Sequence, residues 1–198
     1  MPIENFLTLR SACVPLHEEN VDTDQIIPAR YLKSTSRKGF GDNLFHDWRY
    51  DREGNPVKDF VLNDSRFGGS ILVAGRNFGT GSSREHAAWA IRDYGFRVVV
   101  SSSFADIFRN NALNNGLLAV EVTKRFLSVL FDSIYNDPAT EVNVNLEQQF
   151  IQILPDGRAE NFEIGSYRKN CLLKGYDDID FLIGLRQKTV EYEKFNHL

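Results

Sequence analysis

A run of small polar and charged residues in the middle of the chain is the part best suited to chemistry. The segment Phe78–Ala87 reads Phe-Gly-Thr-Gly-Ser-Ser-Arg-Glu-His-Ala. Ser82 and Ser83 offer two hydroxyls, and Arg84 offers a planar guanidinium that suits a carboxylate or a phosphate. The glycines let the backbone approach a ligand closely. This combination predicts a carboxylate site in which a serine alkoxide, stabilised by positive charge, could act as a base on a carbon acid.

The same residues also fit a purely structural role. Ser82 followed three residues later by Glu85 is the capping-box pattern with which a helix begins. We expect a helix from about Ser83 to Tyr94, because apolar residues recur there on one face and Gly95 can end it. Ser82 would then be the N-cap residue. Both interpretations, helix start and chemical site, stay open on this pattern alone.

The neighbouring elements predict where this turn lies. Apolar strands without alternation are expected at residues 70–74, 98–100 and 117–122, with helices between them. Such strands, separated by helices, are typical of a buried parallel sheet with right-handed crossovers. The turn after residue 74 would therefore lie on the carboxyl side of the sheet, where ligands of such folds bind.

The rest of the chain adds further elements to this sheet. We expect a weak strand in the first dozen residues, a helix over 124–135, an antiparallel hairpin region over 140–165 and a helical segment over 166–198. Residues 33–55 are rich in Gly, Ser, Asp and Arg and are expected to form a long functional loop. The predicted fold class is α/β, a single domain over residues 1–198 with a parallel sheet flanked by helices and an added antiparallel, barrel-like layer.

Composition excludes several classes of function. The 198 residues include 23 basic and 27 acidic side chains, a net charge of −4, which does not provide the basic field that nucleic acids require. No apolar run is long enough to cross a membrane and no signal peptide is recognisable, so we expect a cytoplasmic protein. Cys13 and Cys171 lie far apart without a Cys-x-x-Cys pair, which fits a reducing compartment and provides no metal-ligand set.

Common phosphate-binding loops do not fit the glycine-rich turn. After Gly79 and Gly81, a dinucleotide-binding loop needs a third glycine where Arg84 stands. A P-loop needs Gly-Lys-Ser/Thr, but Gly81 is followed by Ser82. These mismatches disfavour a nucleotide-binding protein.

The Phe78–Ala87 segment closely resembles the signature of the swivelling domain of the aconitase superfamily. Val21–Pro28, which reads Val-Asp-Thr-Asp-Gln-Ile-Ile-Pro, is similar to the N-terminal motif of that domain. Other segments resemble the bacterial small subunits of 3-isopropylmalate dehydratase, namely Gly39–Gly41, Asp47–Arg49, Phe104–Phe108 and Asp177–Ile179. The resemblance covers essentially the whole chain.

The resemblance implies one subunit of a two-chain hydro-lyase of leucine biosynthesis. In that family a large subunit carries a [4Fe-4S] cluster whose open iron acts as a Lewis acid, and the small subunit closes over it. The implied reaction dehydrates 2-isopropylmalate to isopropylmaleate and rehydrates it to 3-isopropylmalate. The implied assembly is a heterodimer with the cluster-bearing large subunit, with no cofactor in this chain.

The resemblance also implies roles for individual residues. Ser82 would take the carbon-bound proton and return it, while Ser83 and Arg84 would hold a substrate carboxylate. Thr23 and Asp24 match positions beside the hydrogen-bond network of the active site. Asp24 would take part in the proton network, and Thr23 would contribute to substrate binding.

The segment Tyr31, Leu32 and Lys33 falls where related small subunits contact the variable side chain of the substrate. A small subunit of a homoaconitate or methylmalate-type hydro-lyase stays open as an alternative, because one methylene changes binding by only about 1–3 kcal/mol. From a different class, a non-catalytic dicarboxylate-binding module would use the same loop and helix end without turnover.

Overall fold

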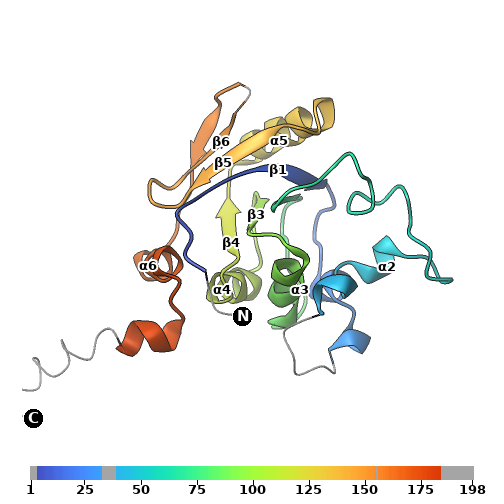
Figure 1. Cartoon of the computed structure of the whole chain (residues 1–198), viewed down its shortest axis with the longest axis horizontal. Coiled ribbons are helices and arrows are strands. Elements are labelled where there is room, and N and C mark those ends of the chain that lie inside the picture. Colours follow the sequence, from blue (N-terminus) through green and yellow to red (C-terminus); the bar gives the residue numbers. More distant parts are fainter. Residues whose placement is uncertain (1–3, 33–38, 155, 184–198) are drawn as a thin grey trace, which may run out of the picture.

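Figure 1 shows a computed structural model of the chain, which describes residues 4–32, 39–154 and 156–183. Within these residues one seven-stranded sheet has the order β4-β3-β2-β1-β5-β6-β7. Its parallel strands are β1 (Thr8–Leu16), β2 (Ile71–Ala74), β3 (Val98–Ser101) and β4 (Leu118–Glu121). Its antiparallel strands are β5 (Glu141–Asn145), β6 (Phe150–Ile153) and β7 (Ala159–Asn161).

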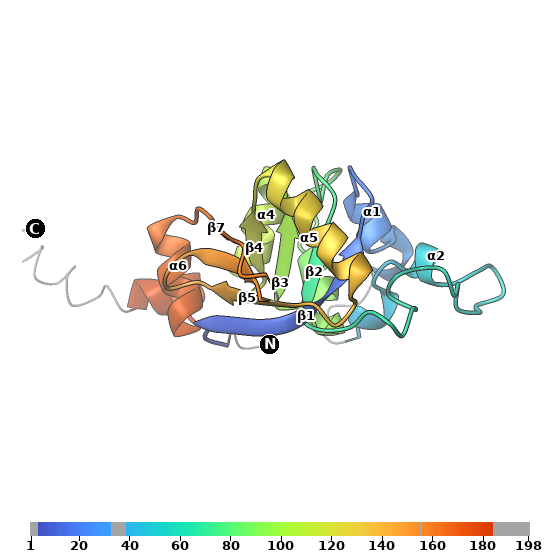
Figure 2. The ribbon, with the colours of Figure 1, turned by 90° about the horizontal axis from the view of Figure 1, so that it is seen from above.

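Strand β1 joins the parallel and antiparallel halves of the sheet. Its second half, Cys13–Leu16, pairs in parallel with β2, whereas its first half, Thr8–Ala12, pairs antiparallel with β5. The antiparallel strands expected from the sequence are thus present, and they continue the same sheet beyond β1. Because the two partners pair along different halves of β1, the mixed sheet curls into a half-barrel (Figures 1 and 2).

Helices cover both faces of the parallel strands. Alternate strand residues enter different cores: Leu72 and Val99 pack with α3 (His86–Tyr94) and α4 (Asp106–Asn114), whereas Val73 packs with α5 (Lys124–Asn136). In Figure 1, α5 lies above β1, and α3 and α4 lie below it. Burial on both faces explains why these strands show no polar alternation, and it confirms the prediction of a parallel sheet flanked by helices.

The predicted long loop is only partly a loop. The short helices η2 (Gly41–Asn43) and α2 (His46–Arg49) lie within its described part, and Phe40 and Phe45 are buried. The prediction failed here because the buried aromatic residues follow no helical or strand period. Residues 33–38 lie outside the described part.

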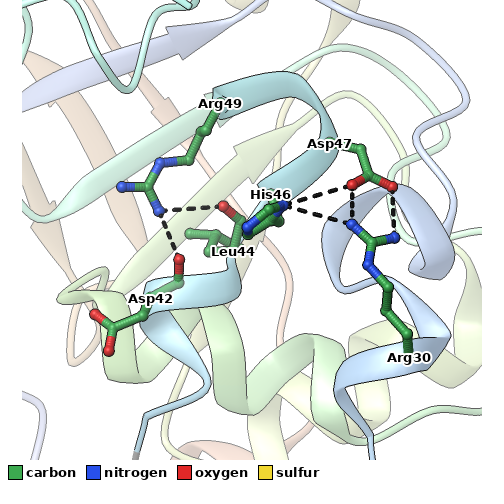
Figure 3. Close-up of polar contacts among 6 residues, drawn as sticks. All are labelled: Arg30, Asp42, Leu44, His46, Asp47 and Arg49. Carbon is green, nitrogen blue, oxygen red and sulfur yellow. Dashed lines mark hydrogen bonds and ion pairs between the residues drawn. The ribbon is translucent and has the colours of Figure 1, made fainter. Parts of the chain in front are cut away.

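Arg49 makes contacts both within this segment and with helix α3. Its Nη1 donates to the backbone carbonyls of Asp42 and Leu44, at 3.3 Å each (Figure 3). Its guanidinium also lies over the ring of Tyr94 on α3, 5.0 Å from the ring centre. Arg49 therefore stabilises the backbone of this segment.

The remaining elements are α1 (Thr23–Ile26), η1 (Ala29–Tyr31), α6 (Ser166–Lys174) and helical residues 178–183. The described part of the 166–198 segment thus consists of two helical stretches, 166–174 and 178–183, separated by a turn, and residues 184–198 lie outside the description. In the described ranges, no helix combines the length and the apolar character that crossing a bilayer demands.

Candidate active site

The segment Ser82–Glu85 lies before helix α3 rather than inside it. Helix α3 begins at His86, and the N-cap residue Glu85 makes no capping hydrogen bond with its side chain. The predicted capping box at Ser82 is therefore wrong. The physical reason is a tertiary contact, since the backbone and the hydroxyl of Ser82 both bind Thr23 instead.

Two loops at the carboxyl ends of β1 and β2 bring Thr23 and Ser82 together. The loops run side by side through a parallel bridge between Asp22 and Thr80, and the Thr23 N–H donates to the Thr80 carbonyl at 2.8 Å. A capping box between Asp22 and Gln25, with both hydrogen bonds at 2.8 Å, fixes the start of α1. The direction of the Thr23 side chain is thus set on both sides.

The contact between Thr23 and Ser82 involves two hydrogen bonds. The Ser82 N–H donates to Thr23 Oγ1 at 3.2 Å, and the two hydroxyl oxygens are also 3.2 Å apart. Because Thr23 Oγ1 accepts the backbone N–H, its own proton is free to point at Ser82 Oγ. Thr23 is only 1% exposed, whereas Ser82 is half-buried, so the pair has a dry side and a side open to a ligand.

Arg84 and Asp24 form an ion pair beside this hydroxyl pair. The Arg84 Nη1 atom lies against Asp24 Oδ1, and the arginine side chain is 25% exposed against 55% for the aspartate. Across the two loops, Thr23 thus contacts Ser82, and Asp24 contacts Arg84. This arrangement can bind an anion at the guanidinium and hold a hydroxyl next to it.

The serine loop, residues 75–85, connects β2 to α3, and its start is fixed by contacts from the sheet. The Asn77 N–H donates to Ser103 Oγ at 2.8 Å, and Ser101 Oγ donates to the Gly75 carbonyl at 2.7 Å. Gly79 adopts a positive φ of 82° and lies directly on the buried ring of Phe108. The serine loop therefore starts from a rigid base on β3 and α4.

Tyr31 and Leu32, predicted to bind substrate, lie in a different cluster from Ser82. The Tyr31 ring lies 4.9 Å from the ring of His46 on α2 and under the guanidinium of Arg30. Arg30 in turn donates to Asp47, as Figure 3 shows, and this hydrogen bond holds the pKa of the Asp47 carboxyl below its usual range.

Leu32 is half-buried at the end of η1 and packs against the same core as α2. Lys33, the third member of this predicted group, lies outside the described residues. The described contacts therefore join Thr23 and Asp24 to Ser82 and Arg84, and they attach Tyr31 to α2 instead.

The two cysteines are separate and buried. Cys13 lies in the sheet on β1 and Cys171 in α6, and burial raises the pKa of both thiols. Across residues 4–32, 39–154 and 156–183, no three side chains of His, Cys, Asp or Glu gather in a way that could hold a metal ion.

Asn111 and Asn115 also contact the serine loop, and the sequence analysis missed both. The Asn111 Nδ2 donates to the Ser83 carbonyl at 3.2 Å, and the Asn115 Nδ2 donates to Glu85 Oε1 at 2.7 Å. The spacing of four residues between two asparagines on a half-buried helix face is the signal that could have identified them.

Comparisons with known proteins identify the family of this chain. Residues 3–125 match the aconitase C-terminal domain family, and the chain belongs to this family. It is 57% identical to the 3-isopropylmalate dehydratase small subunit of Christiangramia forsetii, over 97% of this chain and 94% of that protein. It is 56% identical to the small subunit of the same name in Cytophaga hutchinsonii, over 97% of this chain and 96% of that protein.

A solved structure agrees with these relatives. A crystal structure of 3-isopropylmalate dehydratase from Methanocaldococcus jannaschii superposes with a TM-score of 0.67 at 27% identity, covering 95% of this chain and 99% of that one. Within the aconitase family the chain is therefore grouped with the 3-isopropylmalate dehydratase small subunits.

Proposed function

We infer that this chain is the small subunit of a 3-isopropylmalate dehydratase, a hydro-lyase of leucine biosynthesis. The observation that carries this inference is the match, over nearly the full length of both chains, to proteins named as that small subunit. The reaction interconverts 2-isopropylmalate and 3-isopropylmalate through isopropylmaleate.

We propose that Ser82 is the base that removes the carbon-bound proton and later returns it. A serine needs stabilisation of its alkoxide to do this, because its ordinary hydroxyl is a very weak acid. The Thr23 hydroxyl, 3.2 Å away, can donate to Ser82 Oγ, since its own oxygen already accepts the Ser82 N–H. The positive charge of Arg84, two residues further on, adds to the same stabilisation.

Arg84, together with Ser83, would hold a carboxylate of the substrate. A guanidinium has five N–H donors, so it can bind the Asp24 carboxylate on one side and a substrate carboxylate on the other. In this proposal Asp24 belongs to the charged network of the site and orients Arg84. Its carboxylate keeps the guanidinium next to Ser82 before the substrate arrives.

We propose that the partner is a large subunit carrying a [4Fe-4S] cluster, as the family resemblance implies. Cys13 and Cys171 are buried in different elements and do not fit as ligands of such a cluster. The role of this chain is then to bring the Ser82 and Arg84 side chains to a site completed by the large subunit. Two buried free thiols are compatible with the cytoplasm, where we place the enzyme.

Tyr31, Leu32 and Lys33 are proposed to contact the isopropyl group of the substrate. The support for this role is the family resemblance, and the attachment of Tyr31 to α2 gives the segment a fixed starting point. The role of this segment can be tested by comparing malates with different substituents.

The test is reconstitution of the two-subunit enzyme. The chain is mixed anaerobically with the cluster-bearing large subunit from the same organism, and the absorbance of the alkene formed from 2-isopropylmalate is followed, with homocitrate and citramalate alongside. We expect activity only in the mixture and the highest kcat/KM with 2-isopropylmalate. A preference for another malate would contradict the substrate, and no turnover in a formed complex with an intact cluster would contradict the enzyme function.

Two variants test the role of Ser82 in the same assay. Ser82→Ala should lower kcat by at least about 10³-fold while the complex still assembles, as expected when the nucleophile or base of a site is removed. Ser65→Ala, at an exposed serine whose side chain makes no hydrogen bond within the described residues, is the matched control. Equal activity of the two variants would rule out Ser82 as the base.

A further inference from the structure

Helix α4 presents a row of side chains to the serine loop. Phe108, Asn111 and Asn115 follow one another at spacings of three and four residues, so they lie along one face of the helix and its C-terminal cap. They contact three successive points of the loop, namely Gly79, Ser83 and Glu85. The loop therefore lies along α4 from Gly79 to Glu85.

The first of these contacts is steric. A Cβ atom added at Gly79 would lie 2.2 Å from Cγ of Phe108, so the loop backbone rests directly on this ring. The ring itself is 1% exposed and packs edge-to-face on Phe78, with centroids 5.1 Å apart. This contact fixes where the loop begins.

The other two contacts are polar and fix where the loop ends. Asn111 Nδ2 donates to the Ser83 carbonyl at 3.2 Å. Asn115 uses its whole amide, since Nδ2 donates to Glu85 Oε1 at 2.7 Å and to the Asn111 carbonyl at 2.8 Å, while Oδ1 accepts the Trp89 indole N–H at 2.9 Å. Asn115 thus ties the loop, α3 and α4 to one another.

The contacts from α4 and from α1 fall on alternating points of the loop. On helix α1, Thr23 makes a hydrogen bond with the Ser82 hydroxyl, and Asp24 forms an ion pair with the Arg84 guanidinium. From helix α4 and its C-terminal cap, Asn111 and Asn115 donate to the Ser83 carbonyl and the Glu85 carboxylate. Ser83 lies between Ser82 and Arg84 in the sequence, and Glu85 follows Arg84. The loop therefore has hydrogen-bonding partners on two sides.

We propose that Asn111 and Asn115 are positioning residues of the active site: through the Ser83 carbonyl and the Glu85 carboxylate they set the distance of Ser82 from the carbon that it deprotonates. This inference rests on the proposed function of Ser82. A displacement of about 1 Å in a reacting group can cost about 10²-fold in rate, so the effect falls on kcat more than on substrate binding.

Asn111→Ala and Asn110→Ala form a matched pair of variants. Asn110 is the neighbouring residue on α4, it is exposed, and its side chain makes no hydrogen bond within the described residues. In the reconstituted enzyme we expect Asn111→Ala to lower kcat about 10-fold or more with KM changed less than about threefold. Asn110→Ala should keep both constants.

A reversal of the Asn115–Glu85 hydrogen bond gives the second test. In Asn115→Asp two carboxylates face each other, so the loop is pushed away and kcat should fall about 10-fold or more. In the double variant Asn115→Asp/Glu85→Gln the glutamine amide can donate to the aspartate, while the hydrogen bond to the Asn111 carbonyl stays lost, so kcat should recover in part, by about threefold or more. Glu85→Gln alone keeps a carbonyl acceptor for Asn115, so its kcat should fall less than that of Asn115→Asp.

The isolated chain offers a readout that needs no activity. The sequence has two tryptophans, so the indole N–H region of a nitrogen–proton correlation spectrum contains two signals, one of them from Trp89. Asn115→Asp should shift the Trp89 signal, because the indole N–H then donates to a carboxylate instead of an amide oxygen, whereas Asn110→Ala should leave it in place. Circular dichroism and thermal unfolding establish that each variant folds.

The outcomes separate the two proposals. If the unchanged complex turns over 2-isopropylmalate but Asn111→Ala is as active as Asn110→Ala, the positioning role is wrong and the proposed function stands. If the fall in apparent kcat equals the fraction of assembled complex that is lost, measured by size-exclusion chromatography of the same mixture, Asn111 and Asn115 act only on assembly, which also overturns the inference. If Ser82→Ala keeps full activity, the proposed role of Ser82 itself fails.

Discussion

Replacing Gly79 by alanine tests how closely the serine loop packs on α4. Two effects add in this variant. The positive φ of 82° costs a side-chain-bearing residue about 1–2 kcal/mol. The new Cβ would also lie 2.2 Å from Cγ and 2.4 Å from Cβ of Phe108, atoms close to the helix backbone that cannot swing away. Overpacking of this kind costs about 1–3 kcal/mol or more.

Gly54→Ala is the control that separates these two effects. Gly54 has nearly the same φ, 83°, but nothing lies within 4 Å of an added Cβ. Its free-energy cost is therefore only conformational, and it is partly offset by about 0.4–1 kcal/mol of lost freedom in the unfolded chain. The same offset applies to both glycines, so we expect about 1 kcal/mol for Gly54→Ala and about 2–4 kcal/mol for Gly79→Ala.

Thermal unfolding measures the difference. A loss of 1 kcal/mol lowers the Tm of a chain of this size by about 2–4 °C, so Gly54→Ala should lose a few degrees and Gly79→Ala roughly 5–15 °C. Gly79→Ala should also lose activity in the reconstituted enzyme at temperatures where it stays folded. Equal Tm losses in the two variants would refute the close packing of the loop on Phe108.

Two further predictions concern the Thr23 hydroxyl and a carboxylate on the C-terminal side. Thr23→Val keeps the side-chain volume but removes the hydroxyl, which leaves the Ser82 N–H without its acceptor. We expect the stability to fall by about 1–3 kcal/mol and kcat to fall about 10²-fold, whereas Thr23→Ser should behave like the unchanged chain. Full turnover by the valine variant in the steady-state assay would contradict this prediction. The Tyr167 hydroxyl and the Arg168 guanidinium donate to Asp178 and hold its pKa below the usual range. A carboxyl whose pKa is lowered in the folded state stabilises the fold when the pH is above its ordinary pKa of about 4, and this stabilisation is lost as the pH falls through the folded-state pKa. The contact of α6 with residues 178–183 should therefore weaken only in acid. Tyr167→Phe should raise this pKa in an NMR titration of Asp178, and an unchanged titration would show that the tyrosine does not hold the carboxylate.

The strands of the parallel half could be predicted because burial on both faces leaves a direct trace in the sequence. Ile71–Ala74 and Val98–Val100 are continuous apolar runs, and each became a strand with every residue buried. The segment around Phe40 and Phe45 left no such trace. Its two anchors are buried by contacts with distant elements, and no local period marks them.

The start of α3 shows the opposite relation between local pattern and structure. Ser82 and Glu85 satisfy a local rule for a helix start, yet the helix begins at His86. A capping box contributes about 1 kcal/mol, and the alternative partners of the loop, Thr23 on one side and Asn111 on the other, outweigh it together. The Ser103 hydroxyl, which accepts the Asn77 N–H, is a further tertiary contact that fixes the loop.

The sequence by itself determined the residue types of the site and the positions of the buried strands along the chain, because these depend on local composition and spacing; the family followed from the resemblance of its motifs to known ones. Only the tertiary structure decided that Thr23 meets Ser82 across 59 positions of the chain and that α4 supports the loop from behind. The physical reason is that these contacts depend on the parallel pairing of β1 with β2, which brings the ends of two distant strands to one edge of the sheet. A hydrogen bond of this kind has no local period, and it exists only once the sheet has formed.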